Sequence, residues 1–169
     1  MSSELLNYEI NPHHWCWRQG EFEGTSAVIF DIDGVLADAA GRQHLLTPPK
    51  RDWEEFFSAC GQDPIIEEVT RLLDVIDPNL KIILLTGRPV RVRPQTLDWL
   101  ERFNLRWDLL IMRDFGDHSA ATSFKEVTVN ELKKRDFKLL LALEDDKRNL
   151  EMFNYNDIPC VYIHSGYYD

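Results

Sequence analysis

The sequence has few cysteines, no long apolar run and a shortage of basic residues relative to acidic ones. Its three cysteines lie far apart and include no C-x-x-C pair, which argues against a disulfide framework or a zinc ribbon and suits a reducing compartment. No apolar run approaches the roughly 20 residues that span a bilayer. The first residues lack a basic segment followed by an apolar core, so no signal peptide is evident. We therefore expect a cytoplasmic protein with no membrane contact.

Positive charge is also in deficit. The formal net charge is −10, which works against non-specific binding to nucleic acid, because Lys and Arg are needed to neutralise phosphates. A few basic residues can nevertheless hold one phosphate inside an acidic protein. The sequence contains no G-x-x-x-x-G-K-[ST] segment, the loop that binds nucleotide phosphates in many kinases. Any kinase activity would have to come from a separate protein.

The apolar pattern predicts an α/β fold. At 169 residues the chain has the length of one ordinary domain. Short apolar runs alternate with amphipathic helices, which predicts a single Rossmann-like three-layer domain with a five-stranded parallel sheet. The predicted strands are 27–30, 81–85, 108–112, 138–143 and 159–163, and the predicted helices are 51–59, 65–76, 90–103, 126–135 and 148–155.

Residues 1–24 show little periodicity and are predicted to form an N-terminal extension packed on the domain of residues 25–169. His13, His14 and Cys16 occur in this segment, but their spacing matches no metal template.

Two carboxylates follow the first predicted strand, in the stretch VIFDIDGVLAD. Asp31 and Asp33 are two residues apart and Gly34 comes next. Side chains two apart on an extended backbone point the same way, so these carboxylates should converge. They repel each other unless a cation or a shared proton lies between them, and such an oxygen-rich pocket suits Mg²⁺. A solvated acidic turn is the ordinary alternative.

Further polar residues follow the other predicted strands. Thr86-Gly87-Arg88 follows the second strand, Lys125 precedes a helix after the third, and Glu144-Asp145-Asp146 follows the fourth. Alone, each could be a turn, a surface lysine or an acidic helix start. Ligands bind parallel sheets at the carboxyl ends of the strands. The occurrence of all of them at these ends therefore favours one functional site.

In this order the four segments resemble the four signatures of the haloacid dehalogenase superfamily of phosphohydrolases, over about residues 25–165. Within it, DGVLADAAGRQHLL, LLTGRP, LALEDDKRNLEMF and SGYYD look similar to the 3′-phosphatase domain of polynucleotide kinase-phosphatases. There are two departures. Val35 stands where Thr is commoner, and Glu144 stands where that relative has Asp. Because Glu is longer, Asp145 is the expected metal ligand, and whether Glu144 or Asp146 also contacts the metal stays open.

The resemblance implies a strand order of 3-2-1-4-5. The segment 37–79 holds only a loop and two short helices, which predicts a minimal or absent cap domain. It implies that Asp31 is the nucleophile and that Asp33 is the general acid and base. It also implies a Mg²⁺ ion held by Asp31, Asp145 and the backbone carbonyl of Asp33. Thr86 and Lys125 would hold phosphoryl oxygens, and Arg42 and Arg88 would contact the substrate.

These expectations describe a Mg²⁺-dependent phosphomonoester hydrolase that forms an aspartyl-phosphate and removes 3′-phosphate from nucleic-acid ends. The short segment 37–79 leaves the site open, which suits a large substrate, and a separate kinase or ligase is a possible partner. A nucleotide or small-metabolite phosphatase is the alternative. A phosphate- or metal-binding module without turnover is the third hypothesis.

Overall fold

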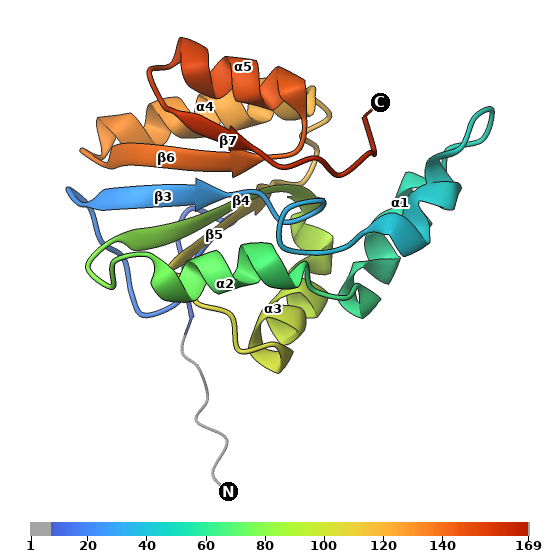
Figure 1. The fold of residues 1–169 in the computed structure, drawn as a ribbon, viewed down its shortest axis with the longest axis horizontal. Helices are drawn as coiled ribbons and strands as arrows, with labels where there is room; N and C mark the ends of the chain where they lie inside the picture. Colours follow the sequence, from blue (N-terminus) through green and yellow to red (C-terminus); the bar gives the residue numbers. More distant parts are fainter. Residues whose placement is uncertain (1–7, 169) are drawn as a thin grey trace, which may run out of the picture.

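The computed structural model describes residues 8–168, and in this range the chain forms one mixed sheet flanked by helices (Figure 1). The sheet has the order β1-β2-β5-β4-β3-β6-β7. The five strands from β5 to β7 in this order pair in parallel. They are β3 (Ser26–Phe30), β4 (Lys81–Pro89), β5 (Leu109–Arg113), β6 (Lys138–Glu144) and β7 (Cys160–Tyr162).

The prediction of a five-stranded, all-parallel sheet is wrong, because two antiparallel strands extend the sheet beyond β5. They are β1 (Glu9–Ile10) and β2 (Trp15–Trp17), and β2 pairs with β5. All three residues of β2 are buried, so it shows no alternation of apolar and polar residues that would reveal a strand. Residues 1–7 of the predicted extension lie outside the described residues.

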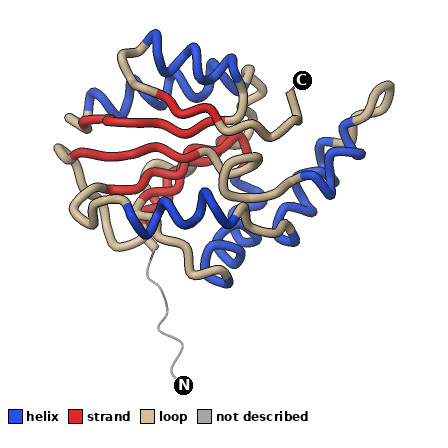
Figure 2. Tube along the Cα trace, in the orientation of Figure 1, coloured by secondary structure: helices blue, strands red, loops and turns tan. Residues whose placement is uncertain are grey.

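Helices cover both faces of the sheet, as Figure 2 shows. Their ends differ by a few residues from the predicted ones, and α4 starts early enough to contain Lys125. The helices are α1 (Trp53–Ser58), α2 (Glu67–Val75), α3 (Arg93–Arg102), α4 (Ala121–Lys134) and α5 (Lys147–Tyr155). Within the described part of the chain, none is long and apolar enough to cross a membrane.

The two faces of the sheet carry separate cores because side chains alternate along each strand. In β3, Val28 and Phe30 belong to the core beneath α2 and α3, whereas Ala27 and Ile29 belong to the core beneath α4 and α5. The central strands are therefore apolar throughout, as expected for parallel strands covered on both sides. Packing on both faces holds the carboxyl ends of these strands in place, and it therefore also positions the polar residues that follow them.

A small helical insert lies between β3 and α2. It consists of the 3₁₀ helix η1 (Ala40–Leu46), α1 and the 3₁₀ helix η2 (Ala59–Gln62). Residues 40–46, which none of the predicted helices covers, are therefore helical. The insert projects beyond the carboxyl ends of the strands (Figure 1), so it lies on the side of the sheet where polar residues gather.

Candidate active site

Two groups of charged side chains lie at the carboxyl edge of the sheet. We call the first the acidic group. It consists of Asp31, Glu144, Asp145 and Lys125. We call the second the arginine group. It consists of Asp33, Asp63, Arg42 and Arg88. The turn after β3 joins them, because it supplies Asp31 to one group and Asp33 to the other.

The acidic group brings three carboxylates together around one ammonium. Carboxylate oxygens of Asp31, Glu144 and Asp145 all lie within 4.8 Å of one another. Lys125 Nζ donates to Glu144 Oε2 at 2.7 Å and lies 3.3 Å from Asp31 Oδ1. Burial opposes the charge of Lys125, but Asp31 and Glu144 outweigh it and raise its pKa. Lys125 is therefore a fixed positive charge beside the predicted nucleophile.

Asp145 is the carboxylate that the protein leaves unsatisfied. Both of its oxygens are buried and neither has a hydrogen bond of good geometry among the described residues. Burial raises the pKa of Asp145 to about 7; the neighbouring Ser165 hydroxyl acts to lower the pKa, and Glu144 acts to raise it. Burial and Glu144 likewise raise the pKa of Asp31. A buried carboxylate without a partner is costly, so a cation fits between Asp31 and Asp145.

Both carboxylate oxygens of Glu144 already accept hydrogen bonds from the protein. Besides Lys125 on Oε2, the backbone N–H groups of Asp145 and Asp146 donate to Oε1 at 3.1 and 3.3 Å. The Asp146 carboxylate caps α5 and pairs with Arg148. These contacts leave Asp31 and Asp145 as the two side chains best suited to hold a metal.

The turn after β3 fits closely over Asp145. Gly34 has a φ of +81°, a conformation that glycine adopts without strain. A Cβ atom at this position would lie 2.0 Å from Asp145 Oδ2, so any other residue here would force the Asp145 carboxylate to move. The backbone at Gly34 therefore packs directly against the Asp145 carboxylate and helps to bury it.

The arginine group holds Asp33 from two sides. Arg42 Nη2 donates to Asp33 Oδ1 at 2.6 Å and Arg88 Nη2 donates to the same oxygen at 2.7 Å. Burial acts to raise the pKa of Asp33, but Arg88 and Arg42 together outweigh it and lower the pKa. Asp33 is consequently a carboxylate in the described arrangement. Thr86 is linked to this group because its Oγ1 accepts from the N–H of Arg88 at 3.2 Å.

Asp63, at the end of the insert, belongs to this group although nothing in the sequence marked it. Its carboxylate accepts from Arg42 Nε at 2.9 Å and from Arg42 Nη2 at 2.6 Å, and it lies 3.6 Å from Arg88. The Phe56 ring lies 4.4 Å from the Arg42 guanidinium. The insert therefore positions Arg42. Only its contact with Arg42 in the tertiary structure identifies Asp63, and a single sequence gives no information about that contact.

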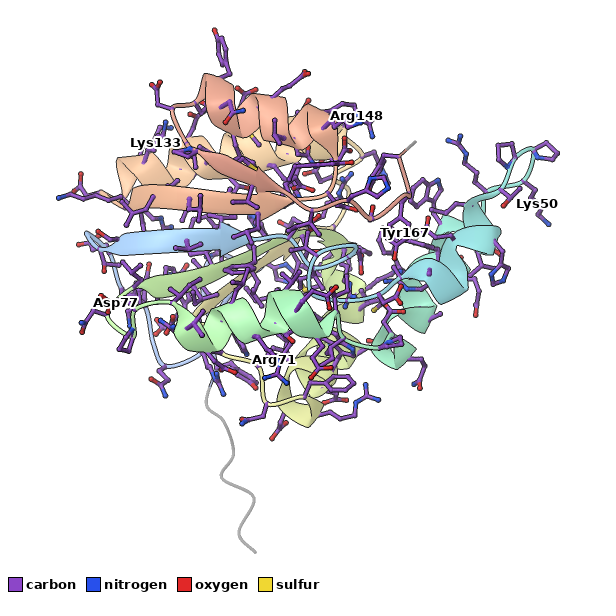
Figure 3. The ribbon with its side chains drawn as sticks, in the orientation of Figure 1. Lys50, Arg71, Asp77, Lys133, Arg148 and Tyr167 are labelled. Atoms are coloured by element: carbon purple, nitrogen blue, oxygen red, sulfur yellow. The ribbon has the colours of Figure 1, made fainter. Side chains whose placement is uncertain are left out.

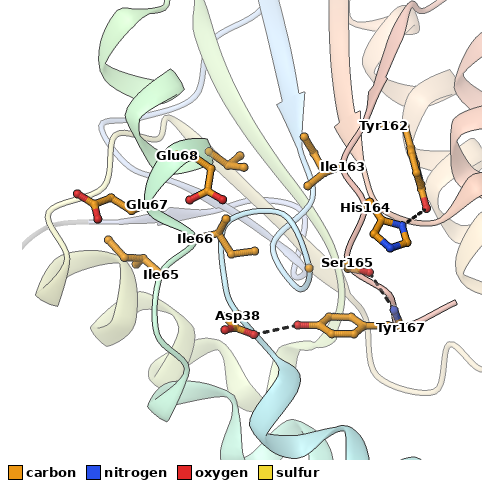
Figure 4. Close-up of a pocket in the computed structure, with 12 residues that line it drawn as sticks. Asp38, Ile65, Ile66, Glu67, Glu68, Tyr162, Ile163, His164, Ser165 and Tyr167 are labelled. Atoms are coloured by element: carbon orange, nitrogen blue, oxygen red, sulfur yellow. Dashed lines mark hydrogen bonds between the residues drawn. The ribbon is translucent and has the colours of Figure 1, made fainter. Parts of the chain in front are cut away.

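A cavity of about 590 Å³ adjoins the turn that carries Gly34. Figure 4 shows it between that turn, the start of α2 and the C-terminal segment. The Tyr167 hydroxyl donates to Asp38 Oδ1 at 3.1 Å, which holds the C-terminal segment against the turn. The lining combines isoleucines and tyrosines with the carboxylates of Asp38, Glu67 and Glu68, and it includes no Lys or Arg.

The comparisons with known proteins identify the class of protein. The chain is a phosphatase of the haloacid dehalogenase superfamily. Within it, the chain belongs to the family described as "Polynucleotide kinase PNKP phosphatase domain", whose model matches residues 25–168. A search of the curated proteins finds no match.

Solved structures give the same result. The chain is 28% identical to a protein of the Pnkp1/Rnl/Hen1 RNA repair complex, with a TM-score of 0.69 over 82% of this chain and 42% of that chain. A second structure of a Pnkp1/Rnl/Hen1 complex gives 27% and 0.71 over 82% and 45%. The chain thus spans less than half of these relatives. A class C acid phosphatase from Bacillus anthracis with tungstate bound shares the fold, at 12% identity and a TM-score of 0.62 over 89% and 70%.

Proposed function

We propose that this phosphatase hydrolyses phosphomonoesters with Mg²⁺ through an aspartyl-phosphate on Asp31, and that its substrates are nucleic-acid ends with a 3′-phosphate. The observation that carries the proposal is the pairing of the two groups at one edge of the sheet. The acidic group offers a carboxylate beside a cation site, and the arginine group offers guanidinium groups beside a second carboxylate. The family match and the RNA repair complex among the similar structures support the choice of substrate.

In the first step an oxygen of Asp31 attacks phosphorus and the ester oxygen departs with a proton from Asp33. In the second step Asp33 takes a proton from the water that cleaves the aspartyl-phosphate. Asp31, Asp145 and the backbone carbonyl of Asp33 would hold Mg²⁺, which offsets repulsion between the carboxylates and the substrate. Lys125 and Thr86 would contact the phosphoryl oxygens, where charge spreads in the transition state.

The arginine group suggests how Asp33 could serve both steps. As a carboxylate held by Arg42 and Arg88, it is ready to accept a proton. A phosphoryl group draws guanidinium groups toward its own oxygens. This would weaken their hold on Asp33 and raise its pKa toward protonation. Arg42 and Arg88 would then bind the substrate and control Asp33 at the same time.

Two features extend the proposal to the size of the substrate. The insert of residues 40–62 is short, so the site stays open to a chain end rather than enclosed by a large cap domain. A separate kinase or ligase would then act on the same ends. Hydrolysis of nucleotides is the second candidate, because the hollow in Figure 4 adjoins the turn that carries Gly34 and could receive a base. Its acidic lining, without Lys or Arg, makes it a poor place for phosphates.

Phosphate release with Mg²⁺ from matched 3′- and 5′-phosphorylated oligonucleotides and from mononucleotides separates these candidates. We expect selective release from the 3′-phosphorylated oligonucleotide. The variant Asp31→Asn keeps the shape of the site, so it should fold normally and lose turnover by at least about 10³-fold. Turnover retained by Asp31→Asn would exclude an aspartyl-phosphate at this residue. Release mainly from mononucleotides would assign the protein to nucleotide hydrolysis. No phosphate release by the folded wild type from any of these substrates would favour the third hypothesis, a phosphate- or metal-binding module without turnover.

A further inference from the structure

One tryptophan differs from all the others in its exposure. Trp53, the first residue of α1, is 49% exposed. The remaining four of the five tryptophans are at most 3% exposed, and they are Trp15, Trp17, Trp99 and Trp107. Single exposed apolar side chains are ordinary on a protein surface, so the neighbours of Trp53 decide what its ring can do. Trp53 packs against the ring of Phe57, with centroids 5.9 Å apart and an interplanar angle of 26°, so the ring is held in place.

Trp53 is connected to the arginine group by direct contacts. Its ring lies 5.7 Å from that of Phe56, which in turn lies 4.4 Å from the Arg42 guanidinium. Arg42 Nη2 is 2.6 Å from Asp33. The exposed ring is therefore only two side chains away from the carboxylate proposed to protonate the leaving group. This contact path runs through the buried side chains of Phe56 and Arg42, so the Trp53 ring lies on the outer side of the residues that hold Asp33.

Charged residues of both signs flank Trp53 along the chain. Lys50 and Arg51 come just before it, are exposed, and form no ion pair within residues 8–168. Asp52, between Arg51 and Trp53, caps α1 by accepting from the N–H of Glu55. Figure 3 shows Lys50 at the outer end of the insert. The acidic Glu54 and Glu55 follow Trp53 by one and two residues, which turns them by about 100° and 200° around the helix. Phe56 and Phe57 return to the side of Trp53, so Glu55 faces away from the aromatic side, whereas Glu54 lies beside it.

We propose that the Trp53 platform, meaning the stacked rings of Trp53 and Phe57 with Lys50 and Arg51, binds the single-stranded nucleic-acid end that carries the 3′-phosphate. A base stacks on Trp53 while Lys50 and Arg51 contact the backbone, which is how proteins bind single strands without reading their sequence. This inference rests on the proposed function, because it assigns the place of the leaving chain.

Trp53 supplies its own probe, because it is the exposed tryptophan among five that all lie within the described residues. In the Asp31→Asn protein with Mg²⁺, a 3′-phosphorylated oligonucleotide of about six nucleotides should quench tryptophan emission. Trp53→Phe should abolish the quench and keep the affinity. Trp53→Ala should weaken the Kd about tenfold. Tyr155→Ala, which removes an aromatic ring that is 85% exposed on α5, is the matched control and should change nothing.

A hydrolysis assay of the same Trp53 and Tyr155 variants, made in the protein that keeps Asp31, shows whether binding at Trp53 matters for turnover. For Trp53→Ala, the kcat/KM for the oligonucleotide relative to that for a small aryl phosphate should fall about tenfold. Because this is a ratio, partial loss of folded protein does not change it. Lys50→Glu combined with Arg51→Glu should lower the same ratio and reduce its dependence on salt.

The outcomes separate the platform from the proposed function. An unchanged Kd and an unchanged ratio in Trp53→Ala would overturn the platform, even if the wild type hydrolyses oligonucleotides. Trp53-dependent quenching by a wild type that releases no phosphate from any substrate would uphold the platform and reject the proposed function. Self-association that disappears in Trp53→Ala, without quenching by the oligonucleotide, would show that the surface binds a second copy of this chain and would also overturn the platform.

Discussion

The acidic group and the arginine group lie at the same edge of the sheet, but they differ in how their charges are balanced. The arginine group sets two carboxylates against two guanidinium groups, with direct contacts among all four residues. The acidic group sets three carboxylates against one ammonium and leaves both oxygens of Asp145 without a partner. The charges of the first are balanced by side chains of the protein, whereas those of the second are not, which is why we propose a cation there. Removing a charge should therefore have opposite consequences in the two groups.

Among these tests of the two groups, the largest loss of stability is expected from Asp63→Ala in the arginine group. This change leaves the buried Arg42 with an excess charge, and breaking a buried pair in this way costs about 3–5 kcal/mol. For a chain of this size the Tm should fall by about 10 °C. Arg42 would also lose its position against Asp33, so kcat should fall by about 100-fold at temperatures where the variant is folded. Thermal melts and steady-state kinetics measure both.

Asp63→Asn is the matched control, since it keeps the volume and one acceptor for Arg42. It should lose less stability than Asp63→Ala while still lowering kcat. If Asp63→Ala melted within about 2 °C of the wild type with an unchanged kcat, the arginine group would not depend on Asp63.

A smaller change in stability, and of opposite sign, is expected from Asp145→Asn in the acidic group. Without metal this variant should be at least as stable as the wild type, because it removes a buried carboxylate that has no partner. Saturating Mg²⁺ should stabilise the wild type by about 2–3 kcal/mol at 100 times its Kd and should stabilise the variant far less. Thermal melts with and without Mg²⁺ measure this, and equal shifts in both proteins would place the ion elsewhere.

The pH dependence sharpens the same test. The pKa of Asp145 is raised by burial to about 7 in the folded chain, above its unfolded value of about 3.9. The folded state therefore binds this proton more tightly than the unfolded state. Stability of the metal-free protein should then fall as pH rises from about 4 to about 7. Mg²⁺ competes with the proton, so its stabilising effect should be larger at pH 8 than at pH 5.5. Asp145→Asn should lack this difference.

The smallest effect is expected outside both groups, from Tyr167→Phe. The change removes one half-buried hydrogen bond to Asp38, which is worth about 1 kcal/mol or less. The C-terminal segment should stay in place, so the Tm should fall by only a few degrees and KM should change less than about threefold. A loss of activity comparable to that of Asp63→Ala would mean that the C-terminal segment, rather than the arginine group, controls the site.

Much of this arrangement could be predicted because it follows from local patterns. Short apolar runs specify the central parallel strands, and residues that follow parallel strands meet at one edge. Asp31, Lys125 and Asp145 were expected to meet there, and the structure brings them together. Asp33, Arg42 and Arg88 were also expected at this edge, although their contacts with one another were not. Their roles in catalysis stay predictions.

What the sequence did not reveal depends on contacts between distant segments. Asp63 precedes Pro64 in what reads as an ordinary turn, and only the folding of the insert brings it to Arg42, 21 residues earlier. The strand β2 contains three buried residues, and it is recognisable as a strand only through its pairing with β5. Neither feature has a local signature, since neither depends on the period of the apolar pattern.

The two short strands at the ends of the sheet limit how this protein can associate with others. In the described part of the chain, β1 has two residues and β7 has three. An exposed edge strand is a template on which another chain can add a strand, and very short edges offer few backbone groups for this. We therefore expect any companion enzyme to bind through side-chain surfaces, which point mutations can alter one at a time, rather than by extending the sheet.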